Sequence, residues 1–80
     1  MKVEKLQALR VHGVGEGFHV LIVPDDRHGE NFRDFYLVQE RTGHTLIMFG
    51  CFPDNDEHAV QIAQNNAPEY INDGLFREVD

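Results

Sequence analysis

Five histidines and one cysteine are the side chains of this 80-residue chain best suited to hold a metal ion: His12, His19, His28, His44, His58 and Cys51. Structural zinc sites usually use closely spaced pairs such as C-x2-C or H-x3-5-H, and the chain has neither. His12 and His19 flank a glycine-rich loop, where we expect them to lie on different faces. His58 could approach Cys51 and Asp54, which gives only three donors. The pattern therefore predicts exposed, titratable histidines, with no metal site and no cofactor.

Cys51 could also act through its sulfur, because a thiolate just before a helix can serve as a nucleophile or a redox sensor. It lies three residues ahead of the expected helix cap. The expected strand pairing also places it opposite Asp34, whose negative charge would raise the pKa of the thiol. Cys51 is therefore a candidate reactive thiol, and the competing interpretation is a small buried apolar side chain.

Two further patterns match ligand-binding loops only in part. Gly13-Val14-Gly15-Glu16-Gly17 has the glycines of a phosphate-binding loop, but an expected strand follows it and no lysine does, so a hairpin turn is favoured. Asp54-Asn55-Asp56 resembles the start of a calcium loop, yet Ala59 and Asn65 stand where that loop requires glycine and glutamate. These segments are expected to be a turn and a helix cap.

The polar loop at residues 25–31 and the acidic start of the expected helix are where we expect a partner to be recognised. Loops that are held by rigid neighbours often carry function. A solvated surface is the competing interpretation, because the loop mixes both charge signs and acidic residues stabilise a helix N-terminus. The candidate binding residues are Asp25, Asp26, Arg27, His28, Glu30, Asp54, Asp56 and Glu57.

An α+β fold is expected to position these residues. Apolar runs over residues 18–24, 32–40 and 44–52 predict three strands, of which the last two form a hairpin around Arg41-Thr42-Gly43. Residues 3–11 favour a strand, with a helix as the alternative. Short connections predict a small antiparallel meander of about four strands within a single domain, residues 1–80.

The end of the chain predicts helix. Apolar residues recur at helical spacing between Ala59 and Ala67, and Asp54 with Glu57 would form a capping box at the start. Pro68 is expected to begin a short second helix, since proline fits the first helical position. Residues 74–76 are expected to end that helix and fold back onto the core.

Both faces of the expected sheet are apolar. The pairs expected from a two-residue turn at Thr42-Gly43 are Val38 with Ile47, Tyr36 with Phe49, and Asp34 with Cys51. A three-residue turn would shift these pairs by one. The helical hairpin would cover one face, so the other needs either a sheet curled into a barrel or a second molecule. A homodimer is favoured, because a domain of this size gains much from association.

Charge narrows the choice of partners. The 7 basic and 14 acidic residues give a net charge of −7, which disfavours nucleic acid and anionic membranes as partners. No apolar run could span a bilayer, and a single cysteine is typical of the reducing cytoplasm. We expect a non-catalytic protein-binding or regulatory module that self-associates through its sheet. The alternatives are a ligand-binding or enzymatic domain with a pocket at a dimer interface, and an acidic nucleic-acid mimic that inhibits a basic protein.

Overall fold

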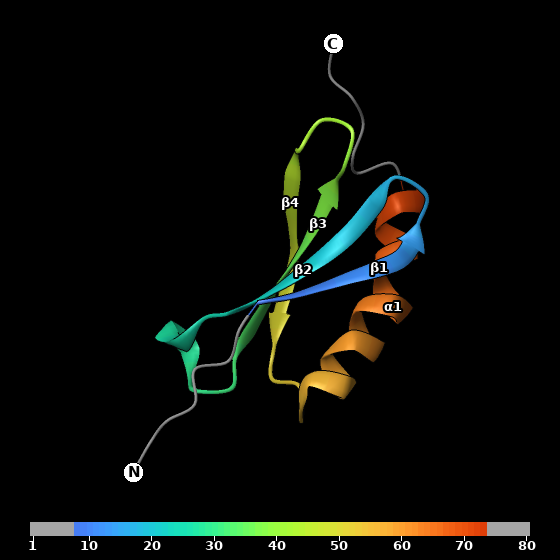
Figure 1. The fold of residues 1–80 in the computed structure, drawn as a ribbon. Coiled ribbons are helices and arrows are strands. Elements are labelled where there is room, and N and C mark those ends of the chain that lie inside the picture. Colours follow the sequence, from blue (N-terminus) through green and yellow to red (C-terminus); the bar gives the residue numbers. More distant parts are fainter. Residues whose placement is uncertain (1–7, 74–80) are drawn as a thin grey trace.

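The computed structural model describes residues 8–73, which form one four-stranded antiparallel sheet followed by a helix (Figure 1). The strands follow one another across the sheet in the order β1-β2-β3-β4, so the predicted α+β meander is confirmed. Their bounds are β1 Leu9–Gly15, β2 Phe18–Pro24, β3 Arg33–Gln39 and β4 Thr45–Cys51. The strand favoured for residues 3–11 is present from Leu9 onward, and residues 3–7 lie outside the described part of the chain.

The sheet is open. β1 and β4 form its two opposite edges and are not paired with each other, so a closed barrel is ruled out for residues 8–73. No helix of the described residues is long and apolar enough to cross a membrane.

The helix α1, Asp56–Asn72, begins one residue later than expected, with Asn55 rather than Asp54 as its N-cap. The side-chain oxygen of Asn55 accepts a 2.7 Å hydrogen bond from the backbone N–H of His58. Asp54 instead donates its own backbone N–H to Nδ1 of His58, at 2.9 Å. An asparagine satisfies a free N–H of the first turn as well as an aspartate does, so the two neighbouring cap candidates could not be separated by residue type.

The predicted second helix is wrong, because α1 continues through Pro68 to Asn72. Proline removes one hydrogen bond from a helix interior and disfavours its continuation. Here the buried side of α1 extends on both sides of Pro68, with Ala67 buried and Tyr70 packed against the core. The short 3-10 helix η1, Asp26–His28, is the one other helical element between residues 8 and 73. Residues 74–76 lie outside the described residues.

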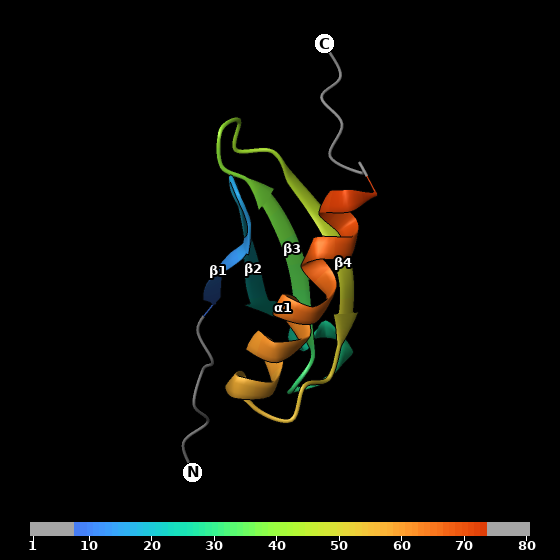
Figure 2. The same ribbon diagram turned by 90° about the vertical axis from the view of Figure 1, so that its right-hand side faces the viewer.

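The helix covers one face of the sheet (Figure 2). It packs mainly against β1 and β2. Three alanines one turn apart, Ala59, Ala63 and Ala67, form its buried side, and their small size lets the helix lie close to the strands. The sheet contributes Val11, Val14, Val20, Ile22, Phe35, Leu37 and Met48 to this core.

The hairpin of β3 and β4 is confirmed. Its pairing near the turn differs from both expected registers, whereas the pairs of residues 33–35 show the shift by one that was expected for a three-residue turn. The turn holds four residues, 40–43, and Gly43 takes a positive φ of 78° in it. Val38 therefore pairs with Thr45 and Tyr36 with Ile47. An irregularity between Phe35 and Tyr36 then shifts the register, so that Phe35 pairs with Phe49.

Candidate functional site

The second face of the sheet carries apolar side chains from β2, β3 and β4, and no element between residues 8 and 73 packs over it (Figures 1 and 2). Because side chains alternate along a strand, the residues between the buried ones point to this face. Its apolar residues are Leu21, Val23, Tyr36, Val38 and Ile47. We call these five residues the uncovered face. Ile47 is 54% exposed, which is unusual for a large aliphatic side chain in the middle of a strand.

An aromatic cluster extends this apolar surface toward η1. The ring of Phe32 lies 5.0 Å from that of Phe52 in an edge-on contact, and 4.6 Å from the ring of His28. Phe52 remains 58% exposed. Apolar side chains thus continue beyond the end of β4, on a surface that a partner could contact.

The polar loop at residues 25–31 is largely satisfied by its own contacts. The Arg27 guanidinium binds the Asp25 carboxylate through two bonds of 2.9 Å, and Asp25 also accepts the backbone N–H of Arg27. Asp26, His28 and Glu30 are exposed. Of the five candidates in this loop, the structure thus joins Asp25 to Arg27 and His28 to the aromatic cluster.

Asp25 also forms a hydrogen bond with the buried Asp34. Burial raises the pKa of Asp34, and its hydrogen bond with the Asp25 carboxylate raises it further. The pKa of Asp25 is lowered, first by the bond from Arg27 and then by that from Asp34. The hydrogen bond between the two carboxyl groups therefore favours the protonated form of Asp34 and the charged form of Asp25.

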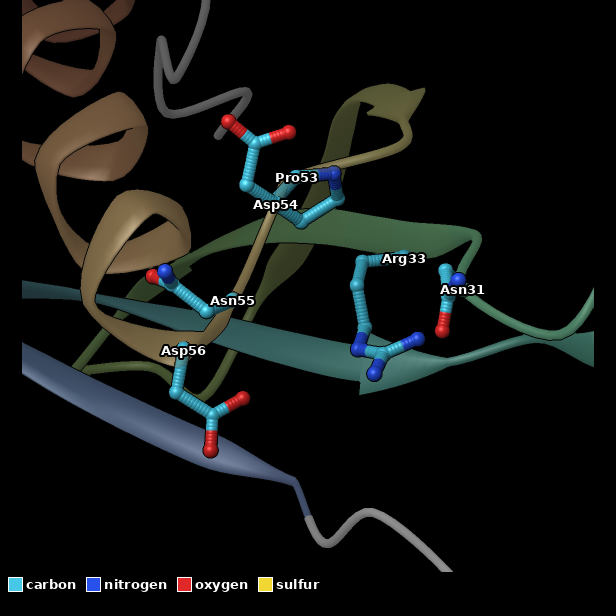
Figure 3. A pocket seen from close by; sticks show the side chains of 6 residues that line it. All are labelled: Asn31, Arg33, Pro53, Asp54, Asn55 and Asp56. Atoms are coloured by element: carbon cyan, nitrogen blue, oxygen red, sulfur yellow. The ribbon is translucent and has the colours of Figure 1, made fainter.

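The acidic start of α1 lines a polar cleft of about 270 Å³ (Figure 3). Its lining residues are Asn31, Arg33, Pro53, Asp54, Asn55 and Asp56. Arg33 is 6% exposed and donates from Nη1 to the backbone oxygen of Phe32 at 2.9 Å. Asp54 and Asp56 are thus brought to the cleft, whereas Glu57 is exposed outside it.

Cys51 pairs with Arg33 rather than with Asp34, which pairs with Gly50. The thiol is partly buried and packs against the core. Burial raises the pKa of Cys51, so the fraction of reactive thiolate is reduced. The physical cause differs from the expected one, because Asp34 is not its cross-strand neighbour.

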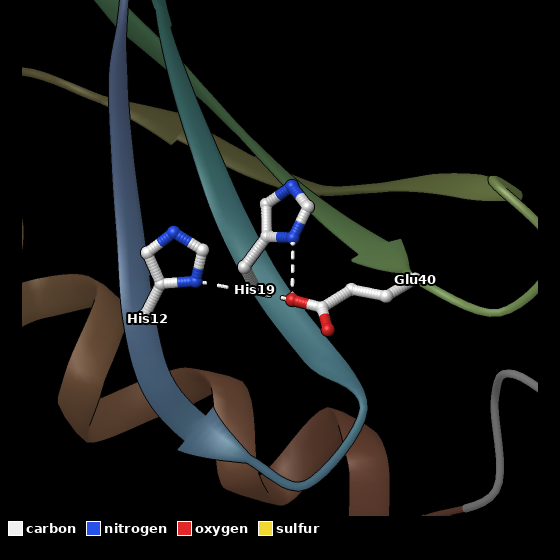
Figure 4. Close-up of side chains that lie close together, drawn as sticks. All are labelled: His12, His19 and Glu40. Atoms are coloured by element: carbon white, nitrogen blue, oxygen red, sulfur yellow. Dashed lines mark hydrogen bonds and ion pairs between the residues drawn. The ribbon is translucent and has the colours of Figure 1, made fainter.

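His12, His19 and Glu40 come together at one end of the sheet, on the same side as the uncovered face (Figure 4). Oε2 of Glu40 lies 2.9 Å from Nδ1 of His19 and 3.8 Å from Nδ1 of His12. The two imidazole rings are 5.3 Å apart. The expectation that these histidines lie on different faces is therefore wrong.

The pairing of β1 with β2 explains this cluster. Val11 pairs with Val20, and His12 and His19 are the next residues toward the turn, where their rings lie close together on one face of the sheet. Glu40 is held nearby because its backbone N–H donates to the carbonyl of Gly17 at 2.9 Å. The sequence positions of His12 and His19 predict their contact only if the register of the β1–β2 hairpin is known. Glu40 comes from the β3–β4 turn and has no sequence signal that links it to either histidine.

No protein-family model, curated protein or solved structure matches this chain, so its function is argued from these residues alone.

Proposed function

We propose that this protein is a non-catalytic protein-binding module that self-associates through the uncovered face of its sheet. The observation that carries the proposal is the row of apolar side chains on that face, which includes the 54% exposed Ile47. An apolar surface of this extent is favourably removed from water by a second copy of the same surface. A small domain also gains stability when it associates.

The size of the sheet limits the dimer to a weak one. Four strands of seven residues span roughly 19 Å by 23 Å, given the usual spacing between strands and the rise per residue. The flat footprint of the whole sheet is then about 440 Å² per copy. Two such footprints total about 880 Å², below the roughly 1,200 Å² at which standard interfaces begin, so the interface belongs to the weak and transient class. We therefore expect a dimer whose population rises with protein concentration.

Charge distinguishes self-association from the acidic-mimic alternative. Each copy carries a net charge of −7, so two copies repel each other and added salt should favour the dimer. A mimic of nucleic acid would bind a basic protein through the same negative charge, and added salt should weaken that complex. The sign of the salt dependence therefore separates these two functions.

Absolute molar mass, measured by light scattering after size exclusion at several protein concentrations, tests the proposal. The wild-type mass should rise from that of one copy toward that of two. Ile47→Lys places a charge on the uncovered face and should remain at the mass of one copy. Gln64→Lys also adds one positive charge, but on the exposed side of α1, and this variant should associate like the wild type. A monomeric wild type, or equal association of Ile47→Lys and wild type, would refute the proposal.

A ligand-binding or enzymatic function is the second candidate, and it is supported by the cleft beside Arg33, which lies within one copy and apart from the uncovered face. A buried guanidinium at the side of a 270 Å³ cleft could orient a small polar molecule. The six lining residues include neither histidine nor cysteine, which favours binding over covalent chemistry. The test is to record the nuclear magnetic resonance chemical shifts of Arg33 and Asn55 while small polar metabolites are added one at a time. Shifts that do not change with any of them would exclude this function.

A further inference from the structure

The geometry points to a zinc-class metal site formed by His12, His19 and Glu40. Among the described residues, these three form the group whose possible ligand atoms all lie within 4.8 Å of one another. Two imidazole nitrogens and one carboxylate oxygen are a common protein ligand set for Zn²⁺. This site could not be predicted from sequence spacing, because its ligands come from β1, β2 and the turn between β3 and β4.

The distances fit a tetrahedral ion after small side-chain rotations. Zinc–nitrogen and zinc–oxygen bonds of about 2.0–2.1 Å at tetrahedral angles place neighbouring ligand atoms roughly 3.3 Å apart. The separations from Glu40 Oε2 to Nδ1 of the two histidines, 2.9 Å and 3.8 Å, lie on either side of that value. Both histidines turn Nδ1 toward the carboxylate in Figure 4. One ion between these atoms would therefore need no movement of the strands.

Two of the ligands already contact each other before any ion binds, through the 2.9 Å hydrogen bond between Nδ1 of His19 and Oε2 of Glu40. The side chain of His19 is 13% exposed, and the backbone N–H of Glu40 donates to the carbonyl of Gly17. The His12 side chain is 66% exposed, so it can rotate inward and leave one side of the ion open to water. Three protein ligands and one open position are typical of zinc sites that bind a further molecule.

The charge balance is also favourable. Two neutral imidazoles and one carboxylate leave a net charge of +1 on a bound Zn²⁺ ion, within a chain whose own net charge is −7. In the ion-free state His19 and Glu40 are joined by a hydrogen bond at Nδ1, and a bound ion would replace that bond, with the proton of the neutral His19 ring on Nε2. Imidazole nitrogen with a single carboxylate favours Zn²⁺ and its neighbours over Mg²⁺ or Ca²⁺, which prefer oxygen ligands.

Calorimetric titration of the full chain with ZnCl₂, free of any histidine tag, tests this inference. The wild type should bind one ion per chain. His12→Ala, His19→Ala and Glu40→Gln should each weaken binding by at least about tenfold. His44→Ala removes a histidine from the exposed β3–β4 turn and should bind zinc like the wild type. Mg²⁺ should give no comparable heat.

Three further measurements test the site. Circular dichroism should confirm that each variant is folded. Co²⁺ added in place of Zn²⁺ should give the visible absorption of a tetrahedral ion only when both histidines are present. Ile47→Lys should keep the zinc affinity of the wild type, because all three ligands belong to one copy. Failure to bind zinc more tightly than about 0.1 mM, or equal weakening by His44→Ala, would overturn the site and leave self-association untouched.

Discussion

The ring of Phe32 lies so close to the backbone of Gly50 that a Cβ atom at Gly50 would come within 2.7 Å of Cε2 of that ring. Real Cβ atoms do not approach a ring carbon this closely. Glycine at this position in β4 therefore lets Phe32 lie flat against the sheet, where it also contacts Phe52. The aromatic cluster depends on the absence of one side chain.

Gly50→Ala should destabilise the protein by about 1–3 kcal/mol, because the added methyl group forces the Phe32 ring to move. Urea denaturation gives the free energy of unfolding. The matched control is the same change in a Phe32→Ala background, where the space is free and alanine should cost little. An equal cost in both backgrounds would contradict the role assigned to the ring.

Asp34 should make stability fall as pH rises through the weakly acidic range. Burial and the Asp25 carboxylate raise its pKa above the ordinary 3.8, so the folded chain keeps a proton that the unfolded chain releases. Asp25 acts in the opposite direction, since its lowered pKa gives stability that is present above about 3.8 and lost at lower pH. Together these two residues place their maximum of stability near pH 4.

Asp34→Asn tests this relationship, because the amide can donate permanently to the Asp25 carboxylate. The fall in stability above pH 4 should become shallower in this variant, as measured by thermal unfolding from pH 3 to 8. Asp26→Asn, an exposed change in the same loop, should keep the wild-type profile. A profile of Asp34→Asn parallel to that of the wild type would show that the folded chain does not favour the protonated form of Asp34.

Pro68→Ala should stabilise the protein by about 1–2 kcal/mol. The proline lies inside α1 and has no N–H to donate to the preceding turn, while alanine restores that bond. Part of the gain is offset because alanine frees the unfolded chain. Denaturant unfolding measures the change, with the exposed Glu69→Ala as the near-neutral comparison. A loss of stability would mean that the packing of the proline ring outweighs the missing bond.

Cys51 should react slowly with iodoacetamide at neutral pH. Burial raises its pKa, so less thiolate is present than in a free cysteine, and access is restricted as well. Mass spectrometry at timed intervals gives the rate, with N-acetylcysteine as the reference, and urea should remove the protection. A rate above that of the reference would revive the reactive-thiol interpretation.

The elements of the fold follow from local patterns. The apolar runs gave three strands within about one residue of their observed ends, and the spacing of Ala59, Ala63 and Ala67 gave the helix. The prediction that the helix ends at Pro68 was wrong, because the packing of the residues around Pro68 outweighs the local cost of a proline inside a helix.

The arrangement of the candidate site depends on the pairing of the strands, which local sequence patterns do not determine. The irregularity beside Phe35 moves Phe49 to the helix-covered side, where it stacks on Phe35 at 4.9 Å, and it gives Cys51 a different partner from the expected one. A shift of one residue reverses the face of every side chain in a strand. The His12–His19 contact was missed for the same reason, because strand pairing rather than strand location decides it.

The packing of α1 against β1 has a consequence for synthesis of the protein on the ribosome. Each hairpin of the meander can close as soon as its own residues have emerged, so β1 to β4 can pair before residues 52–72 leave the ribosome. Until those residues have emerged, the growing chain carries a sheet with both apolar faces bare. Pairing between neighbouring nascent chains, or capture by a chaperone, would take place in that interval.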